Sequence, residues 1–342
     1  MDLSVIVMWT GFTLASYSVV GNDVIQTLGT FLTSNEQRVP WYILWLYAAL
    51  ILGAVLIYGY FNADIAYGRL AKFSFPENYA WYYILPPLVL MSITRLGIPV
   101  STTFMILTLF SLSDIPGDLN SMVGSVFDTK AKLGGMIQKS LMGYLIAFSA
   151  AIAIYLGITK LTEKYFIENP LQDKHRKYWV AAQWLSTGFL WTQWLTQDLA
   201  NIYIYLKGGN ELSTSGFVFS LVLILALLGY IFYSKGGAVQ NVVREKTNTT
   251  DIRSATFIDL IYGVVLFVFK DDYFGLWGGK LPMSTTWVFV GLLAGRELAM
   301  RIHLEKKVST QLLKMIARDA GKISFGLVVS VVLVFAIKLL AQ

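Results

Sequence analysis

The sequence predicts an all-α integral membrane protein made of two inverted-topology repeats, with broken helices or re-entrant helical hairpins in each repeat. Three observations lead to this prediction. Hydrophobic residues make up 56% of the 342-residue chain, and only 14% of its residues are charged. Long apolar segments alternate with polar stretches. Two different polar motifs each occur twice, in the same order and at nearly the same offset, close to half of the chain.

The composition excludes several classes of protein. Soluble domains carry about 25% charged residues, so a chain with 14% and a mean hydropathy of +0.58 predicts lipid as its main solvent. The chain has no cysteine, which excludes disulfides and thiolate chemistry. The net charge of +6 fits basic loops beside anionic lipid headgroups. We therefore expect membrane lipids, and no nucleic acid, as partners.

The apolar segments divide into two matching sets. In the first half they cover residues 3–33, 41–61, 80–95, 99–113 and 140–158, and in the second half residues 179–206, 216–233, 255–270, 283–295 and 323–341. The long segments reach the roughly 20 residues that a spanning helix needs. The third and fourth segments of each set are short, and Gly, Pro and charged residues separate them, a pattern typical of the broken helices of transporters.

The polar stretch 159–178 is the predicted linker, so the first repeat covers residues 1–158 and the second covers residues 179–342. Each half is expected to cross the membrane an odd number of times, which inverts the second half relative to the first. Roughly twice as many Lys and Arg residues fall in the loops on the linker side as in the opposite loops. This bias predicts a multi-pass protein of the plasma (inner) membrane with a cytoplasmic linker and both termini external.

The first repeated motif places a carboxylate inside the opening segment of each half. Its members are an amide, a carboxylate, two apolar residues and a second amide: Asn22, Asp23 and Gln26, then Gln197, Asp198 and Asn201. A carboxylate within a spanning helix costs about 2.5–3.5 kcal/mol. A polar contact between helices would explain one copy, but Asn or Gln supplies such a contact more cheaply, and two matched copies favour a functional pair. Carboxylate and amide oxygens suit Na⁺ rather than a soft metal.

The second repeated motif follows the interruption of each broken pair. It reads Pro99, Val100, Ser101, Thr102, Thr103 in the first half and Pro282, Met283, Ser284, Thr285, Thr286 in the second. Proline is favoured at a helix start, and hydroxyls beside free backbone N–H groups form an anion site. Ordinary N-capping is the alternative, but the duplication favours anion binding.

Two basic residues lie near these motifs. Arg95 precedes Pro99, and Lys280 precedes Pro282. Each basic side chain would either attract a doubly charged anion or reach toward the membrane interface. The sequence leaves both interpretations open.

No enzyme motif accompanies these features, since the chain has no phosphate-binding Gly-rich loop, Ser–His–Asp set or HExxH sequence. We therefore expect no enzymatic activity and no cofactor, with an ion gradient as the source of energy.

The two paired motifs together resemble the inorganic phosphate transporter (PiT) family, whose bacterial members include sulfate permeases. The resemblance covers essentially the whole chain. It implies inverted repeats, helical hairpins that meet near the midplane, cation-coupled uptake of an anion, and a homodimer in many members. It also implies that Na⁺ is held by Asn22, Asp23, Gln26, Gln197, Asp198 and Asn201, and that the anion is bound by Ser101, Thr102, Thr103, Ser284, Thr285 and Thr286.

The sequence departs from the family pattern at Gln26, at Thr196-Gln197, and at Phe104 and Trp287, where family members commonly have His. These positions bear on the anion more than on the fold. The leading hypothesis is Na⁺-coupled phosphate uptake. The alternative on the same scaffold is a sulfate permease coupled to Na⁺ or H⁺. An anion channel and a membrane sensor or scaffold without transport activity are the alternatives of a different class.

Overall fold

The computed structural model describes residues 2–158, 163–209, 211–235, 251–271, 275, 283–304 and 310–341, and this part of the chain forms helices and turns without strands. By length and composition, 6 helical stretches can cross a membrane: Leu3–Asn35, Trp41–Phe61, Leu119–Gly157, Thr214–Tyr233, Ile252–Asp271 and Thr310–Leu340. The predicted all-α, multi-pass membrane protein is thereby confirmed.

The opening span is one helix with an irregular turn at its centre. Helix α1 (Leu3–Val19) continues through a π-helical turn (Val20–Val24) into α2 (Ile25–Asn35). A π turn is rare and occurs frequently at functional sites. Here it contains Asn22 and Asp23, so the first predicted motif coincides with the one distortion of this described span.

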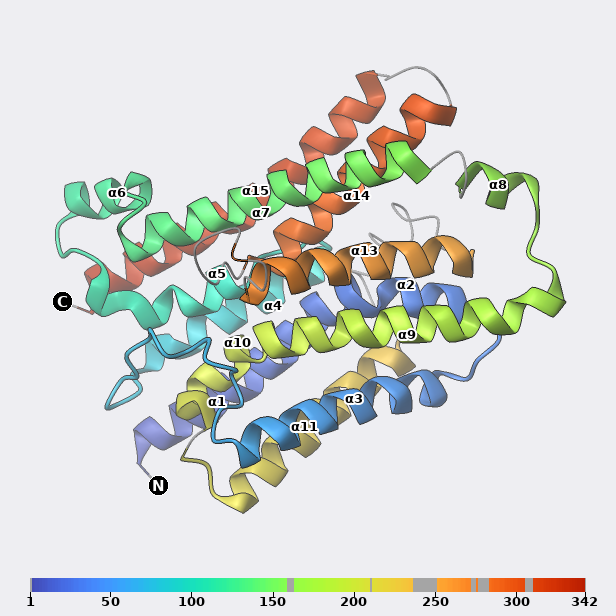
Figure 1. Cartoon of the computed structure of the whole chain (residues 1–342). Helices are drawn as coiled ribbons and strands as arrows, with labels where there is room; N and C mark the ends of the chain where they lie inside the picture. Colours follow the sequence, from blue (N-terminus) through green and yellow to red (C-terminus); the bar gives the residue numbers. More distant parts are fainter. Residues whose placement is uncertain are drawn as a thin grey trace.

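The matching segment of the second half is interrupted in a different way. Helix α9 (Asp173–Asp198) ends at the second motif carboxylate, and α10 (Ala200–Tyr203) and a 3₁₀ turn (Ile204–Gly209) follow it. Polar side chains are buried along α9, which packs against α2, α3 and α13. These neighbouring helices cover the polar side chains of α9, so a helix this polar does not expose them to lipid (Figure 1).

The broken pair of the first half is short, as predicted. Helix α4 (Leu85–Arg95) follows a 3₁₀ turn (Trp81–Ile84), and α5 (Thr102–Leu107) leads into another 3₁₀ turn (Leu109–Asp114). Helix α6 (Leu119–Phe127) then connects this hairpin to α7 (Lys132–Ile158).

The prediction of short segments is wrong for the second half, where α13 (Ile252–Asp271) and α14 (Thr285–Leu304) have 20 residues each. Both helices continue beyond their apolar runs because buried partners neutralise or bind their charged residues. Arg253 pairs with Asp251 at 2.6 Å and donates to the Phe166 carbonyl, and Arg296 donates to the Ser254 hydroxyl at 2.9 Å. Helix α15 (Thr310–Leu340) also begins before its apolar run.

Corresponding helices of the two halves make corresponding contacts. Helix α1 packs on α4 as α9 packs on α13, and α5 packs on α15 as α14 packs on α7. Helix α3 (Trp41–Phe61) packs on α11 (Thr214–Tyr233), its counterpart. The inversion of the halves and their boundaries stay predictions, and residues 159–162 of the predicted linker lie outside the described residues.

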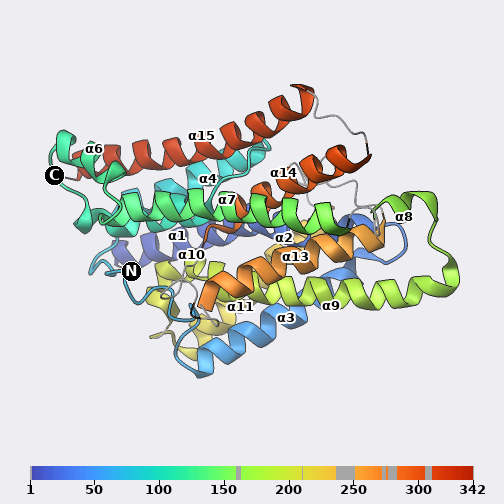
Figure 2. The ribbon, with the colours of Figure 1, turned by 45° about the horizontal axis from the view of Figure 1, so that its top comes forward.

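The termini and the linker lie at opposite ends of the bundle. Both chain ends lie at one end, and α8 (Glu163–Glu168) lies at the other in both views (Figures 1 and 2). Arg253 of α13 contacts the carbonyl groups of Phe166 and Asn169, which attaches the linker to the same end as the start of α13. This arrangement agrees with the prediction that the linker and the termini face opposite sides.

Close helix packing fixes the second hairpin. A Cβ atom at Gly291 would lie 2.5 Å from the Tyr144 carbonyl oxygen, and one at Gly295 would lie 2.4 Å from the Phe148 carbonyl oxygen. Two small residues one helical turn apart therefore let α14 approach the backbone of α7, a common packing device in membranes.

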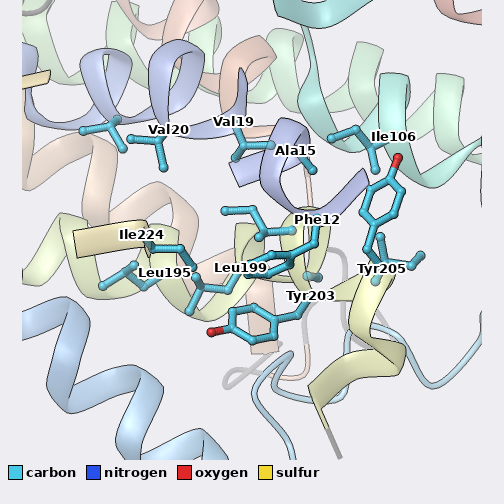
Figure 3. Close-up of a cluster of buried hydrophobic side chains, with 14 of the residues drawn as sticks. Phe12, Ala15, Val19, Val20, Ile106, Leu195, Leu199, Tyr203, Tyr205 and Ile224 are labelled. Carbon is cyan, nitrogen blue, oxygen red and sulfur yellow. The ribbon is translucent and has the colours of Figure 1, made fainter. Parts of the chain in front are cut away.

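An apolar cluster lies beside the interrupted helices. Phe12, Ala15 and Val19 of α1 face Leu195, Leu199 and Tyr203 of the α9–α10 segment (Figure 3). All six side chains are buried. The two motif carboxylates lie in the same two interrupted segments, Asp23 in the π turn and Asp198 at the end of α9, and both are buried.

Candidate ion-binding site

The π turn binds the first hydroxyl turn through Asn22. Its Nδ2 donates to the Val100 carbonyl at 2.7 Å and to Asp23 Oδ1 at 2.6 Å, and the Val100 N–H donates to Asn22 Oδ1 at 3.4 Å. A side-chain amide thus replaces a backbone partner for the α4–α5 turn. The first copies of the two predicted motifs are therefore in direct contact, through Asn22 and Val100.

Two consecutive threonines connect both carboxylates. Thr102 Oγ1 donates to Asp23 Oδ2 at 2.6 Å, and Thr103 Oγ1 donates to Asp198 Oδ1 at 3.1 Å. Asp23 is 1% exposed and Asp198 is 0% exposed. Within the described residues, neither carboxylate forms an ion pair with Lys or Arg within 4.0 Å. The start of α5 therefore joins two buried acids from the two halves.

The second motif leaves several polar atoms open. Asn201 Nδ2 donates to Asp198 Oδ1 at 2.9 Å and to the two threonine hydroxyls at 3.0 and 3.1 Å. The atoms Asp198 Oδ2, Asn201 Oδ1, Gln197 Oε1 and Gln197 Nε2 are buried without a hydrogen-bond partner in the described part of the chain. Three of these atoms are oxygens, on three residues of one helical turn and its continuation.

The two hydroxyl turns meet directly. Ser284 Oγ donates to Ser101 Oγ at 2.8 Å, and Thr286 Oγ1 donates to the Val100 carbonyl at 3.0 Å. The Tyr262 hydroxyl donates to the Thr285 carbonyl at 2.9 Å and holds the second turn from α13. The structure thus brings the four predicted motifs together in one buried cluster.

The hydroxyl hydrogens of the first turn point to carboxylates rather than to open space. Each hydroxyl has a single hydrogen to donate, and those of Thr102 and Thr103 are directed at Asp23 and Asp198. Ser101 also caps α5 by accepting the Phe104 N–H at 3.2 Å. Ser101 therefore both caps α5 and belongs to the cluster.

The remaining predicted residues differ in position. Gln26 is buried, and its Nε2 has no hydrogen-bond partner among the described residues. Arg95 ends α4 as an exposed side chain and is not part of the cluster. Lys280 lies outside the described residues.

The sequence interpretation missed a third buried carboxylate. Asp259 of α13 is 1% exposed and accepts hydrogen bonds from Thr30 of α2 and Thr187 of α9. It lies within the apolar segment 255–270, and the cost of a carboxylate inside a span is the signal that would have found it.

The sequence interpretation also missed Arg69, in the segment between α3 and α4. Its Nη1 is buried without a hydrogen-bond partner in the described chain, and the charge of Asp198 acts on it. A loop residue that reaches a buried site through tertiary packing leaves no periodic signal in the sequence.

Fold and site together define a helical membrane protein with paired, buried carboxylates beside paired hydroxyl turns. No protein-family model and no curated protein sequence matches the chain. A solved structure described as "The sodium-dependent phosphate transporter" is similar over 99% of this chain and 98% of that chain, with a TM-score of 0.57 and 17% sequence identity. At this identity the likeness shows that the two chains share a fold.

Proposed function

We propose that this protein takes up inorganic phosphate across the plasma membrane, coupled to the entry of Na⁺. The observation that supports this most strongly is the second motif, where Gln197, Asp198 and Asn201 each keep a buried oxygen without a donor. Buried oxygens are normally satisfied, so three such atoms in one place indicate a missing ligand. The described similarity to a sodium-dependent phosphate transporter agrees with this proposal.

The missing ligand is a hard cation. Oxygen atoms from carboxylate and amide groups are the ligands that alkali and alkaline-earth cations prefer. In a site of low dielectric, two carboxylates repel each other strongly, and their negative charges also attract cations strongly. We assign Na⁺ to Asp198, Gln197 and Asn201, with Asp23, Asn22 and Gln26 as the counterpart set in the first half.

The hydrogen bonds of Thr102 and Thr103 suggest how the cation and the anion are coupled. Without a cation, both hydroxyls donate to the carboxylates. A cation bound by the carboxylate oxygens would also accept the hydroxyl lone pairs, and the hydroxyl hydrogens would become free to donate to an anion. The cation therefore binds first and prepares the anion site formed by the two hydroxyl turns.

Phosphate fits this site better than sulfate because the hydroxyl turns lie in contact with carboxylates. A protonated phosphate oxygen can donate to Asp23 or Asp198, whereas sulfate at neutral pH can only accept hydrogen bonds. Sulfate remains the second candidate because the guanidinium of Arg69 lies within electrostatic range of Asp198, and a cation there would balance an anion that carries no proton.

The topology of this proposal places the linker in the cytoplasm and both termini outside, in agreement with the Lys and Arg bias. Single cysteines introduced on the naturally cysteine-free chain test it. An impermeant thiol reagent should label a cysteine at residue 2 in intact cells and should not label one at residue 174. Labelling at residue 174 from outside would show that the orientation is reversed. A homodimer stays an expectation from the family resemblance.

Uptake into sealed proteoliposomes tests the function. Labelled phosphate should accumulate when an inward Na⁺ gradient is imposed, and should not accumulate with an equal K⁺ or H⁺ gradient. Labelled sulfate in the same vesicles distinguishes the second candidate. Uptake that proceeds without any cation gradient and stops at equal concentrations would indicate a channel, and no flux of either anion would remove the transport proposal.

A further inference from the structure

Arg69 has a buried charged group without a hydrogen-bond partner for one of its nitrogens. The residue lies between α3 and α4, its side chain is partly buried, and Nη1 is enclosed without a partner among the described residues. Burial lowers the pKa of the Arg69 guanidinium, and the charge of Asp198 acts in the opposite direction. Arginine nevertheless stays protonated in proteins, so Arg69 carries a positive charge with an unused donor, and this charge acts on Asp198.

The backbone around Arg69 is fixed against the segment that follows Asp198. Ile65 packs so closely on Gly209 that a Cβ there would lie 2.5 Å from the Ile65 side chain, and Gly209 has φ +81°. Lys132 Nζ donates to the Lys72 carbonyl at 3.0 Å on the other side of Arg69. The position of Arg69 is therefore a property of the packed fold rather than of a free loop.

Two further cations extend this positive charge, Lys139 within range of Arg69 and Lys72 within range of Lys139. Lys132 pairs with Asp114 at 3.1 Å, so that acid already has a basic partner. Because like charges repel, such a group is normally a solvated basic surface. That interpretation is sufficient for the exposed Lys72. It does not explain an enclosed guanidinium nitrogen that has no hydrogen-bond partner among the described residues.

We propose that Arg69 binds the transported oxyanion from the side of the site nearest the chain termini, with Lys72 and Lys139 as a basic entrance to it. This inference rests on the proposed function. A guanidinium donates to two oxygens of a tetrahedral anion at once. The hydroxyl turns supply neutral donors on the other side, so Arg69 adds the positive charge that favours a doubly charged anion over a singly charged one.

Anion binding to the purified full-length protein in Na⁺ tests this role, with Arg69→Gln, Arg69→Lys and the matched control Arg95→Gln. Arg95 is exposed at the end of α4, so its replacement makes the same charge change away from the site. We expect Arg69→Gln to weaken phosphate binding at least about tenfold, corresponding to about 1.4 kcal/mol. Arg69→Lys should lie in between, and Arg95→Gln should leave affinity unchanged.

Thermal unfolding of the same variants separates binding from structure. If Arg69 only balances the charge of Asp198, Arg69→Gln should lower Tm while affinity stays within about twofold, and that result would overturn the inference. Binding of neither phosphate nor sulfate by the unchanged protein would instead overturn the proposed function, and this inference with it. Normal binding by both the unchanged protein and Arg69→Gln overturns this inference alone.

Discussion

The two carboxylate motifs occupy equivalent places in the chain but differ in how far their polar atoms are satisfied. In the first half, both Asp23 oxygens accept hydrogen bonds, and Asn22 is fixed to the backbone of Val100. In the second half, one oxygen each of Asp198, Asn201 and Gln197 lacks a donor among the described residues. The first motif therefore holds the hydroxyl turn in addition to its proposed role as the counterpart cation set, and the second is the open part of the site.

The backbone also differs between the two motifs. The first motif lies in a continuous helix with a π turn, which directs Asn22 and Asp23 together onto the α4–α5 turn. The second lies where α9 ends, and a new short helix begins after Leu199. This interruption is slight, because Leu199 keeps α-helical dihedrals and its N–H still donates to the Leu195 carbonyl at 3.3 Å. The atoms without a partner at this place belong to side chains.

Removing either carboxylate should have the largest effect. Asp23→Asn and Asp198→Asn should each reduce Na⁺-driven uptake to background, because Asn keeps the shape and loses the charge that holds the cation. Membrane insertion should stay intact in both. Normal Na⁺ dependence in both variants would contradict the cation role.

The same two variants should also differ in thermal stability. Asp23→Asn converts an acceptor of two hydrogen bonds into a partial donor, and a hydrogen bond to a charged group is worth about 1.5–3 kcal/mol. Asp198 also accepts two hydrogen bonds, but both are on Oδ1. Asp198→Asn can keep that oxygen in place and put its amide nitrogen where Oδ2 has no donor. Thermal unfolding of the purified proteins should therefore show a clearly lower Tm for Asp23→Asn than for Asp198→Asn. Equal losses would contradict the division into a closed and an open motif.

The contact between the two hydroxyl turns predicts the next largest effect. Ser101→Ala and Ser284→Ala should each weaken phosphate binding, and the double variant should weaken it at least about tenfold. Because the two hydroxyls share one hydrogen bond, their losses in stability should not add. Reduced Tm with unchanged affinity in the double variant would show that these serines only cap helices.

Gln197 and Asn22 offer a smaller contrast between the same regions. Gln197→Met keeps the volume and removes the unpartnered amide, so Na⁺ affinity should fall by roughly tenfold or less with little change in Tm. Asn22→Leu removes the amide bound to Val100 and should lower Tm. Na⁺ titrations and thermal scans on both proteins check this pair, and a reversed pattern would place the open site in the first half.

The smallest effect is expected at the basic entrance. Lys72→Gln should slow phosphate association by no more than a few fold at low salt and should have no effect at high salt, because exposed charges are screened over about 10 Å at 0.1 M. Stopped-flow binding at two ionic strengths measures this. An effect that does not depend on salt would mean that Lys72 has a different role.

The motifs could be predicted from the sequence because their cost or their duplication is visible there. A carboxylate such as Asp23 or Asp198 costs free energy within an apolar segment, and the two hydroxyl turns repeat. The assembly of these residues in one cluster could therefore be predicted from the sequence. The same cost applies to Asp259 within the apolar segment 255–270, but Asp259 belongs to neither repeated motif. The lengths of α13 and α14 could not be predicted from the sequence. Partners of Arg253 and Arg296 allow both helices to continue beyond their apolar residues.

The unequal state of the two motifs was also hidden from the sequence. Gln26 and Gln197 differ from the family pattern, but only the structure shows that both amides are buried with unsatisfied atoms in the described chain. Arg69 depends on the packing of a loop between two helices. Such effects arise from tertiary contacts that neither spacing nor composition records.

The proposed coupling requires that a cation at the open motif releases the hydroxyls of Thr102 and Thr103 for the anion. The most direct measurement is the phosphate affinity of the purified protein as a function of Na⁺ concentration, with K⁺ replacing Na⁺ at constant ionic strength. We predict that Na⁺ raises the affinity at least about tenfold, that phosphate raises the Na⁺ affinity by the same factor, and that Asp198→Asn abolishes both effects. A phosphate affinity that is independent of Na⁺ in the unchanged protein would contradict the claim.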